Sequence, residues 1–389
     1  MKLTGLKVVD LSQFLPGPHL SMMMADHGAE VIMVESPSGE PTRAIGLQQQ
    51  GEAIWFRNIA RGKKSLCLNL KEAEAKEALL KLLDSADVVI EAFRPGVVDR
   101  LGIGYEVVSA RNPGIVYCSI SAYGQTGPKR LKPAHDLSIQ ADSGLVAVNE
   151  GADGQPASPG VPCADMAASL MALSGILMAL VSRDRTGKGD YLDISMQDTL
   201  VAWTPNVMGP VFAENRPPVV KDERSWGGAA MYQIYRTRDG RHLSLGGSEL
   251  KFAKNLLEAL GRPDLFELCK LPPGSGQDPV KAFLRETFAT RTLAEWDQWF
   301  ESVDVCYAPV RNLHEAMQEE HLIERQMVVT DDEGLTHLGV PIKFQNEPGQ
   351  PRFKRPAQGQ DNRGLLLSLG YRESEIEQML AAGALVEKP

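Results

Sequence analysis

The chain has 389 residues, of which 43% are hydrophobic and 23% are charged, and its formal net charge is −9. This length predicts about two domains, the composition is typical of a globular protein, and the acidic balance argues against a nucleic-acid-binding surface. The five cysteines form no CxxC pair, so we expect neither a disulfide framework nor a metal site, and we expect a reducing, cytoplasmic location.

No segment is expected to enter a membrane. The first residues, MKLTGLKVVDLSQF, lack the long apolar run and the cleavage site of a signal peptide. The most apolar window, residues 166–181, is shorter than the ~20 residues that span a bilayer. We predict a buried helix there.

The first 122 residues alternate between strand and helix patterns. LKVVDLS, HLSMMMADHGA and EVIMVES read as strand, helix and strand, a βαβ unit that predicts a parallel sheet. Further strands are predicted at KSLCLNL, DVVIEAF and GIVYCSISAYG, with an amphipathic helix at KEAEAKEALLKLLDSA. The pattern predicts a doubly wound α/β domain. The first turn, SQFLPGPH, lacks the GxGxxG fingerprint, so an oxidoreductase that binds a dinucleotide is not expected.

The composition changes after DYLDISMQDTLVAW, which predicts one more strand and helix. Residues 206–229 mix prolines with charges and are predicted to be a linker. Residues 230–330 are predicted to form a smaller α+β domain, which has a hairpin closed by Asp239 and Gly240 and then three helices. The remaining residues read as a Pro/Gly-rich segment followed by a short helix.

Six stretches that follow one another along the chain carry a family resemblance. They are VVDLSQFLPGP, GAEVIMVE, EAFRPGVVDRLG, SISAYGQTGP, DRTGKGDYLDISMQD and APVRNLHEA. Together they resemble the family III CoA-transferases (CaiB/BaiF), the superfamily that also contains the α-methylacyl-CoA racemases. The resemblance implies an acyl-CoA thioester as substrate, with coenzyme A as part of that substrate and no other cofactor.

The resemblance also implies an architecture. Members have a Rossmann-like large domain, here begun by residues 1–205 and completed by residues 331–389, with the small domain of residues 230–330 between them. Each subunit is ring-like, and two subunits form an interlocked homodimer.

Asp165 stands at the start of the apolar helix, in GVPCADMAASLM. By itself it reads as a helix N-cap, and a helix N-terminus stabilises a carboxylate. The resemblance makes it the catalytic aspartate. In a transferase it attacks the thioester and gives an aspartyl anhydride and then an aspartyl-CoA thioester, whereas in a racemase it exchanges a proton with the α-carbon. We expect backbone amides of the Asp165–Met166 turn to hold the substrate oxygen.

His135 separates the two reactions. A lone histidine in a polar loop is usually structural, but AHD resembles the GHD segment that carries the catalytic histidine of the racemases. Racemisation needs a proton carrier on each face of a planar enolate, and a neutral histidine and a carboxylate can supply both. Ala134, in place of glycine, departs from the racemase pattern.

Glu249 follows the predicted hairpin. Taken alone, it reads as an exposed charge at a helix start. The racemases have a glutamate at the matching place that orients the histidine, so the resemblance completes a set of His135, Asp165 and Glu249.

Coenzyme A carries several phosphate charges, which call for arginine, lysine and backbone amides. Taken singly, each basic residue of the chain also fits a solvated surface charge. The residues that the resemblance or their charge suggests for CoA binding are Arg94, Arg100, Lys132, Arg61, Lys64, Gln13, Leu15, Tyr123 and Gly124. Gln13 to Leu15 are expected to pack against the adenosine or pantetheine part.

Three functions follow from these observations. The favoured one is an α-methylacyl-CoA racemase or epimerase that uses His135 and Asp165. The alternative is a CoA-transferase that moves CoA from a thioester to a carboxylic acid through Asp165. A non-catalytic CoA-binding subunit is the third, and it would predict the loss of Asp165. The acyl group is not determined by the sequence.

Overall fold

A computed structural model of the chain describes residues 1–151 and 153–387, which fall into two compact units. The first unit comprises Met1–Ser143, Pro159–Trp203 and Glu320–Pro389, and the second comprises Gly144–Ser158 and Thr204–Glu319. The chain therefore leaves the first unit twice, after residue 143 and after residue 203, and returns at residues 159 and 320. The sequence had suggested a single excursion, with boundaries at about 205 and 330, and had assigned residues 144–158 to the large domain. The segment predicted to be a linker contains a helix, α9 (Gly209–Glu214), and belongs to the second unit.

The first unit is built on a six-stranded sheet in which every pair of neighbouring strands is parallel. The strand order is β5 (Lys64–Cys67), β2 (Glu30–Glu35), β1 (Lys7–Asp10), β6 (Val88–Glu91), β7 (Val116–Ser121) and β8 (Asp190–Ser195). After β1, the strands β2 and β5 are added on one side of it. After β6, which lies on the other side of β1, the strands β7 and β8 are added in the opposite direction. The order reverses between β1 and β6, so the carboxyl ends of these two strands form a switch point, where open α/β sheets bind ligands.

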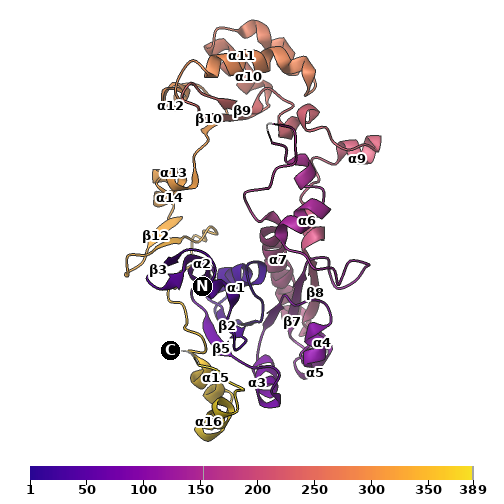
Figure 1. The fold of residues 1–389 in the computed structure, drawn as a ribbon, viewed down its shortest axis with the longest axis vertical. Coiled ribbons are helices and arrows are strands. Elements are labelled where there is room, and N and C mark those ends of the chain that lie inside the picture. The colour runs from indigo at the N-terminus through magenta and orange to yellow at the C-terminus, as the bar shows by residue number, and fades with distance from the viewer. Residues whose placement is uncertain (152, 388–389) are drawn as a thin grey trace. The chain divides into compact units, whose positions relative to one another are not determined.

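Helices cover both faces of this sheet (Figure 1). One face packs against α1 (Pro16–Asp26) and α7 (Cys163–Thr186). The other face shares a core with α3 (Ala73–Leu83), α15 (Asn362–Ser368) and α16 (Glu373–Ala381), in which Val9, Ile32 and Leu79 are almost completely buried. The remaining helices of this unit are α2 (Ile54–Ala60), α4 (Val97–Leu101), α5 (Tyr105–Arg111), α6 (Asp136–Asp142), α8 (Met196–Ala202) and α14 (Glu320–Glu324).

Helix α7 is longer than predicted and is buried on one side only. Its 24 residues include a small-residue face, with Ala167, Ala168 and Ala172 fully buried, whereas Met178 is 72% exposed. Among the described residues, α7 alone is long and apolar enough to cross a bilayer, and 39% of its apolar window is buried inside the structure. A core helix of a globular protein passes the same test, and the buried face of α7 lies against α1 and the sheet.

The second unit has a three-stranded antiparallel sheet in the order β11 (Tyr307–Pro309), β10 (His242–Gly246) and β9 (Tyr232–Arg236). The predicted hairpin joins β9 to β10, and Gly240 takes the left-handed conformation (φ 76°) that its turn requires. The predicted helices are α10 (Leu250–Ala259), α11 (Asp278–Phe288) and α12 (Leu293–Phe300), and Phe288 and Trp296 lie in the core that they share with the sheet. Strand β11 was not predicted.

The C-terminal segment returns to the first unit and completes it. After a hairpin of β12 (Val328–Thr330) and β13 (Thr336–Leu338), the chain reaches the outer edge of β5. There the side chain of Asp361 accepts a hydrogen bond from the Ser65 amide at 2.8 Å, and that of Asn362 accepts one from the Cys67 amide at 2.8 Å. These bonds satisfy the edge strand, which would otherwise present free donors.

Candidate active site

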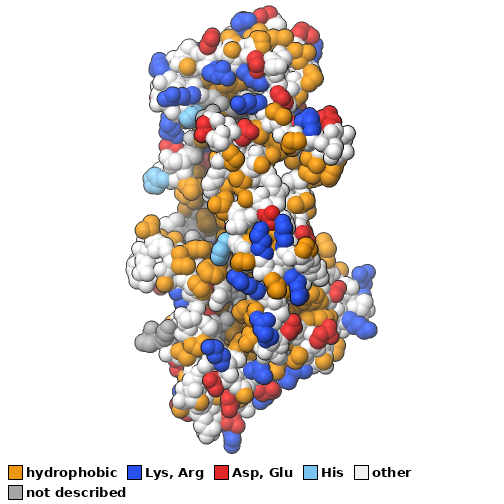
Figure 2. Space-filling view, turned by 45° about the vertical axis from the view of Figure 1, so that its right-hand side comes forward, with side chains coloured by type: hydrophobic (Ala, Val, Ile, Leu, Met, Phe, Trp, Pro, Cys, Tyr) orange, Lys and Arg blue, Asp and Glu red, His pale blue; other side chains and the backbone are white. Residues whose placement is uncertain are grey.

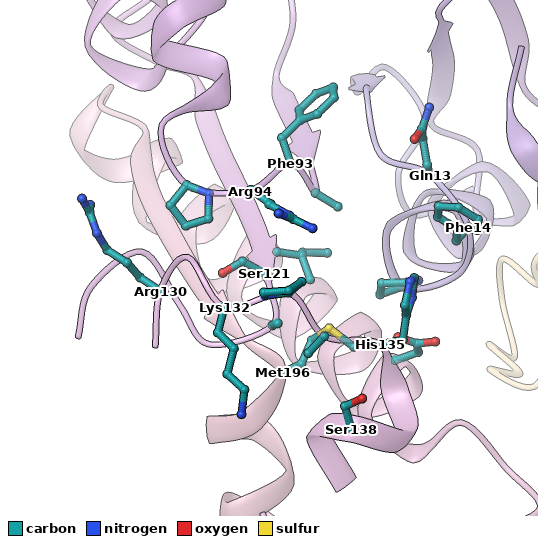
Figure 3. A pocket seen from close by; sticks show the side chains of 18 residues that line it. Gln13, Phe14, Phe93, Arg94, Ser121, Arg130, Lys132, His135, Ser138 and Met196 are labelled. Atoms are coloured by element: carbon teal, nitrogen blue, oxygen red, sulfur yellow. The ribbon is translucent and has the colours of Figure 1, made fainter. Parts of the chain in front are cut away.

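A cavity of about 450 Å³ opens at the carboxyl ends of the strands of the first unit. The turn between β1 and α1 forms one side of it, the segment after β6 another, and the end of β7 its floor (Figure 3). Its position matches the switch point of the sheet. The lining residues are Gln13, Phe14, Pro16, Ala92, Phe93, Arg94, Pro95, Ile120, Ser121, Ala122, Arg130, Lys132, Pro133, Ala134, His135, Ser138, Asp165 and Met196.

Asp165 and His135 both line this cavity. Asp165 is the third residue of α7, and none of the described residues donates a hydrogen bond to its carboxylate. Burial, together with the nearby negative charge of Asp136, raises the pKa of Asp165 to about 7. Its carboxyl group can therefore be present as an acid or as a base near neutral pH.

Asp165 is not the N-cap of α7, so the prediction that it caps this helix is wrong. The N-cap is Pro162, and the capping carboxylate comes from Asp136 at the start of α6. Asp136 Oδ1 accepts hydrogen bonds from the backbone amides of Ala164 at 2.8 Å and of Asp165 at 3.2 Å. The Asp165 side chain is left free of capping and is available for chemistry.

The same bonds overturn the expected oxygen-binding site at the Asp165–Met166 turn. The Asp165 amide is bound to Asp136, and the Met166 amide donates to the Pro162 carbonyl at 3.1 Å. Neither amide is free in this structure. This structure therefore leaves neither amide to donate to a ligand oxygen in the cavity.

His135 occupies the N-cap position of α6 but makes no side-chain cap bond. Its ring lies edge to face with that of Phe14, with centroids 6.2 Å apart and planes at 84°. No described residue donates to or accepts from its ring nitrogens, and the residue is exposed on the cavity wall. The imidazole can thus exchange a proton with a molecule in the cavity.

Glu249 belongs to the second unit, whereas His135 and Asp165 belong to the first. It stands at the N-cap of α10, two residues after Gly247, and its side chain makes no capping bond. It is exposed. The fold of the second unit therefore makes no visible use of this carboxylate.

Arg94 and Lys132 are the predicted CoA-binding cations that line the cavity. Arg94 forms no ion pair with any described residue, and Figure 3 shows its side chain directed across the cavity toward the side that carries Phe14 and His135. Lys132 pairs with Asp142 at 3.5 Å and points away from the centre. Arg130, which was not predicted, also lines the cavity. Lys and Arg side chains gather on the surface of this unit, in the lower half of Figure 2.

The other three basic candidates do not line this cavity. Arg61 is buried and pairs with Asp26 at 2.6 Å, while its second terminal nitrogen donates to the Leu338 carbonyl, so its guanidinium is already occupied within the fold. Lys64 pairs with Glu30 at 2.5 Å on the surface. Arg100 is exposed on α4.

The remaining candidates differ in their relation to the cavity. Gln13 lines it, whereas Leu15 is the N-cap of α1 and its carbonyl accepts a bond from His19. Tyr123 is buried, with the Lys132 ammonium 5.5 Å from the centre of its ring. Gly124 has φ 79°, which favours glycine in this turn.

Ser121 is a cavity residue that the sequence did not reveal. It ends β7 and is 8% exposed, and its hydroxyl has no hydrogen-bond partner among the described residues. A buried hydroxyl without a partner is uncommon in folded proteins. Its place on the cavity wall, between Arg94 and Lys132 in Figure 3, points to a polar atom of a ligand as its partner.

A second cavity, of about 530 Å³, adjoins the first and shares Gln13 and Phe93 with it. It lies at the carboxyl ends of β1, β2 and β5, on the other side of the switch point. Its wall includes Lys71 and the serines that follow β2. A long ligand with an apolar part and an anionic part can extend through both cavities.

Known proteins resemble this chain over nearly its whole length. The model of CoA-transferase family III matches residues 3–362. The chain belongs to CoA-transferase family III. Two curated relatives of this family III protein are each 32% identical to it. Succinyl-CoA:glutarate CoA-transferase of Mus musculus matches over 98% of this chain and 90% of its own, and alpha-methylacyl-CoA racemase of Homo sapiens over 97% and 96%.

The fold of this family III protein also matches solved structures. A CAIB/BAIF family protein from Brucella suis superposes with a TM-score of 0.82 at 28% identity, over 94% of this chain and 99% of the other. The α/β fold with a parallel sheet and the family resemblance are thus confirmed. The relatives include both transferases and a racemase, so the family alone leaves two reactions open.

Proposed function

We propose that this family III protein is an α-methylacyl-CoA racemase or epimerase in which His135 and Asp165 exchange the α-proton of an acyl-CoA thioester. One observation carries the proposal: both side chains line a single cavity, and the pKa of Asp165 is raised to about 7. A proton carrier works best when its pKa lies near the working pH. Asp165 then serves as acid in one direction and as base in the other.

The proton balance of the reaction is simple. Neutral His135 takes the α-proton and becomes an imidazolium, and the substrate becomes an enolate. The protonated carboxyl of Asp165 then gives its proton to the opposite face of the α-carbon, which inverts the configuration. The enzyme is left with charged His135 and ionised Asp165, and this state catalyses the reverse inversion.

Coenzyme A is proposed to lie through the two adjoining cavities. Arg94 and Lys132, with Arg130 beside them, offer the charges that its phosphates require. The second cavity lies where open α/β sheets bind nucleotides, and Lys71 adds a further cation there. Ser121 is proposed to hydrogen-bond a polar group of the substrate.

Two further parts of the proposal come from the family resemblance. Glu249 is proposed to orient His135, which is compatible with its free side chain at the start of α10. The protein is proposed to act as a homodimer in the cytoplasm, where its cysteines stay reduced.

CoA transfer to a carboxylic acid is the second candidate function. The observation that favours it is the Asp165 carboxylate, which faces the cavity with no hydrogen bond from a described residue and so is open to attack a thioester. The succinyl-CoA:glutarate CoA-transferase of Mus musculus is also as similar to this chain as the racemase is. In this reaction His135 is not a proton carrier.

The deciding experiment measures proton exchange without any acceptor acid. The purified full chain is incubated in heavy water with (S)-2-methylacyl-CoA esters of several lengths, and deuterium at the α-carbon and product configuration are followed by NMR and chiral chromatography. His135→Ala and Asp165→Ala are measured in parallel. We expect exchange with inversion in the native protein and its loss in both variants.

The opposite result has an equally definite meaning. If no ester exchanges its α-proton, racemisation is wrong, and candidate acids are added with hydroxylamine. Under transfer, hydroxylamine attacks the activated aspartyl carbonyl, releases CoA and leaves a hydroxamate at Asp165, and His135→Ala keeps most of its activity.

A further inference from the structure

Phe14, in the turn between β1 and α1, has a strained backbone. Its φ is 65°, in the left-handed region that bulky residues avoid, and it is one of four non-glycine residues with positive φ among the described parts of the chain. Such strain persists only where the surroundings enforce it, and it gathers at functional sites. Phe14 also lines the cavity that holds His135 and Asp165.

A buried carboxylate enforces this conformation. The Phe14 amide donates to Glu40 Oε1 at 2.8 Å, and Glu40 is 4% exposed. Glu40 is itself fixed, because its second oxygen accepts the Thr42 amide at 2.6 Å and its own amide donates to Glu35 at 2.9 Å. The strained residue is therefore anchored to the end of β2.

The rest of the turn is anchored as firmly. The Asp10 carboxylate accepts the Ser12 amide at 2.9 Å and pairs with the fully buried Lys63 at 3.3 Å. A Cβ at Gly17 would overlap the Ser12 side chain, so only glycine fits there. Phe14 thus projects from a rigid turn whose two sides are both held.

The Phe14 side chain meets the ring of His135. The 6.2 Å separation and 84° interplanar angle fall in the range of favourable edge-to-face pairs. His135 is otherwise exposed, and no described residue hydrogen-bonds its ring. Among the described residues, only the Phe14 ring packs against the imidazole, and Figure 3 shows both side chains on the same side of the cavity.

We propose that Phe14 is a positioning residue for His135: the anchored turn holds its ring against the imidazole, which keeps a ring nitrogen directed into the cavity. The inference rests on the proposed racemisation for its catalytic consequence. A competing interpretation makes Phe14 only a packing surface for CoA. The two differ because positioning acts on kcat, whereas substrate packing acts on KM.

Four variants separate these interpretations. Phe14→Gly removes the ring and accepts the left-handed backbone, and Phe14→Leu keeps an apolar side chain without a ring. Phe14→Tyr keeps the aromatic ring and is the rescue variant. Gln326→Gly is the matched control, because Gln326 has φ 54° but does not line the cavity.

The first readout is α-proton exchange, with kcat and KM measured separately. The second needs no activity: the full chain is labelled with ¹³C at histidine Cε1, and the His135 Cε1–H resonance is assigned by its loss in His135→Ala. We expect Phe14→Gly and Phe14→Leu to lower kcat at least tenfold with KM changed less than threefold. We also expect both to move the His135 resonance, while Phe14→Tyr stays within threefold of the native kcat.

Each other outcome is decisive. An unmoved His135 resonance in Phe14→Gly overturns the positioning role, and so does a KM effect with native kcat. If Gln326→Gly loses activity as well, relief of backbone strain rather than the ring is responsible, and the proposal falls. If His135→Ala retains exchange, the proposed function fails instead, and the resonance alone then decides whether Phe14 positions His135.

Discussion

The carboxylate of Asp136 holds the first turn of the helix that carries Asp165. It accepts the backbone amides of Ala164 and Asp165, and it lies close enough to the Asp165 carboxyl to raise its pKa further. One side chain therefore both helps to place Asp165 and adds to the burial that raises the pKa of its carboxyl to about 7. Asp136 directly follows His135 in the chain, so the positions of His135 and Asp165 both depend on the same short segment.

Asp136→Asn is expected to separate these two effects. Asparagine can still accept the two amide hydrogen bonds, but the negative charge that raises the pKa of Asp165 is gone. The limb of the pH profile of kcat/KM that reports Asp165 should move toward acid by about one pH unit. Asp136→Ala should show the same shift and, because the cap is lost, should also lower the free energy of unfolding by about 1 kcal/mol. An unmoved limb in Asp136→Asn would contradict the electrostatic role.

Asp165→Asn is expected to stabilise the protein at alkaline pH. The folded-state pKa of about 7 lies above the ordinary value of 3.8, so the folded chain holds a proton that the unfolded chain releases. The contribution of the Asp165 carboxyl to the free energy of unfolding is fully present below about pH 4, and it is lost as the pH rises through 7. At pH 8 the variant should gain about 2 kcal/mol in unfolding free energy, measured by urea denaturation, and at pH 5 much less.

Asp142→Asn is the control for that measurement. A hydrogen bond from the Lys129 ammonium lowers the pKa of Asp142, so the folded state favours the ionised form of this carboxyl group. Its replacement should give no gain at pH 8. A similar gain in both variants would mean that the effect reflects net charge and not the desolvated site.

Ser121→Ala is expected to weaken substrate binding without weakening the fold. The hydroxyl has no partner among the described residues, so its removal breaks no hydrogen bond in the free protein. If it binds the substrate, KM should rise about threefold to tenfold, as expected for a single neutral hydrogen bond. The melting temperature should not fall. A native KM would show that the hydroxyl makes no contact with the substrate.

Glu249→Gln tests the proposed role of Glu249 in orienting His135. The Glu249 side chain caps nothing, so we expect the unfolding free energy to change by less than about 0.5 kcal/mol. The proposal predicts a fall in kcat of about tenfold or more. Glu258→Gln, on the same helix α10, serves as the control and should leave kcat unchanged. Equal rates in the two variants would remove Glu249 from the mechanism.

The sequence was sufficient for the elements whose patterns are local. The βαβ start, the later strands and the hairpin at Gly240 were predicted because alternation, helical spacing and turn residues are properties of neighbouring positions. The long helix α7 was predicted, but it was expected to be buried, and the exposure of one of its sides was not predicted. Its residues are apolar all around, and only the tertiary structure decides which of them meet the sheet.

The site was less predictable, because its geometry depends on distant pairs. Arg61 reads as a free surface cation until its partner Asp26, which lies 35 residues earlier, is seen beside it. The capping of α7 joins Asp136 to amides 28 and 29 residues later. No local pattern marks Asp136 as a cap for a helix that begins so far along the chain.

The closing of the sheet edge has a consequence for synthesis of the chain on the ribosome. The donors of β5 meet their partners only at Asp361 and Asn362, and Leu68 pairs with Leu385, near the end of the chain. The whole second unit is made before those partners emerge, a delay on the order of tens of seconds at ordinary elongation rates. Throughout that time the nascent first unit carries an unfinished sheet edge, so its C-terminus is the last piece of a fold that its N-terminus begins.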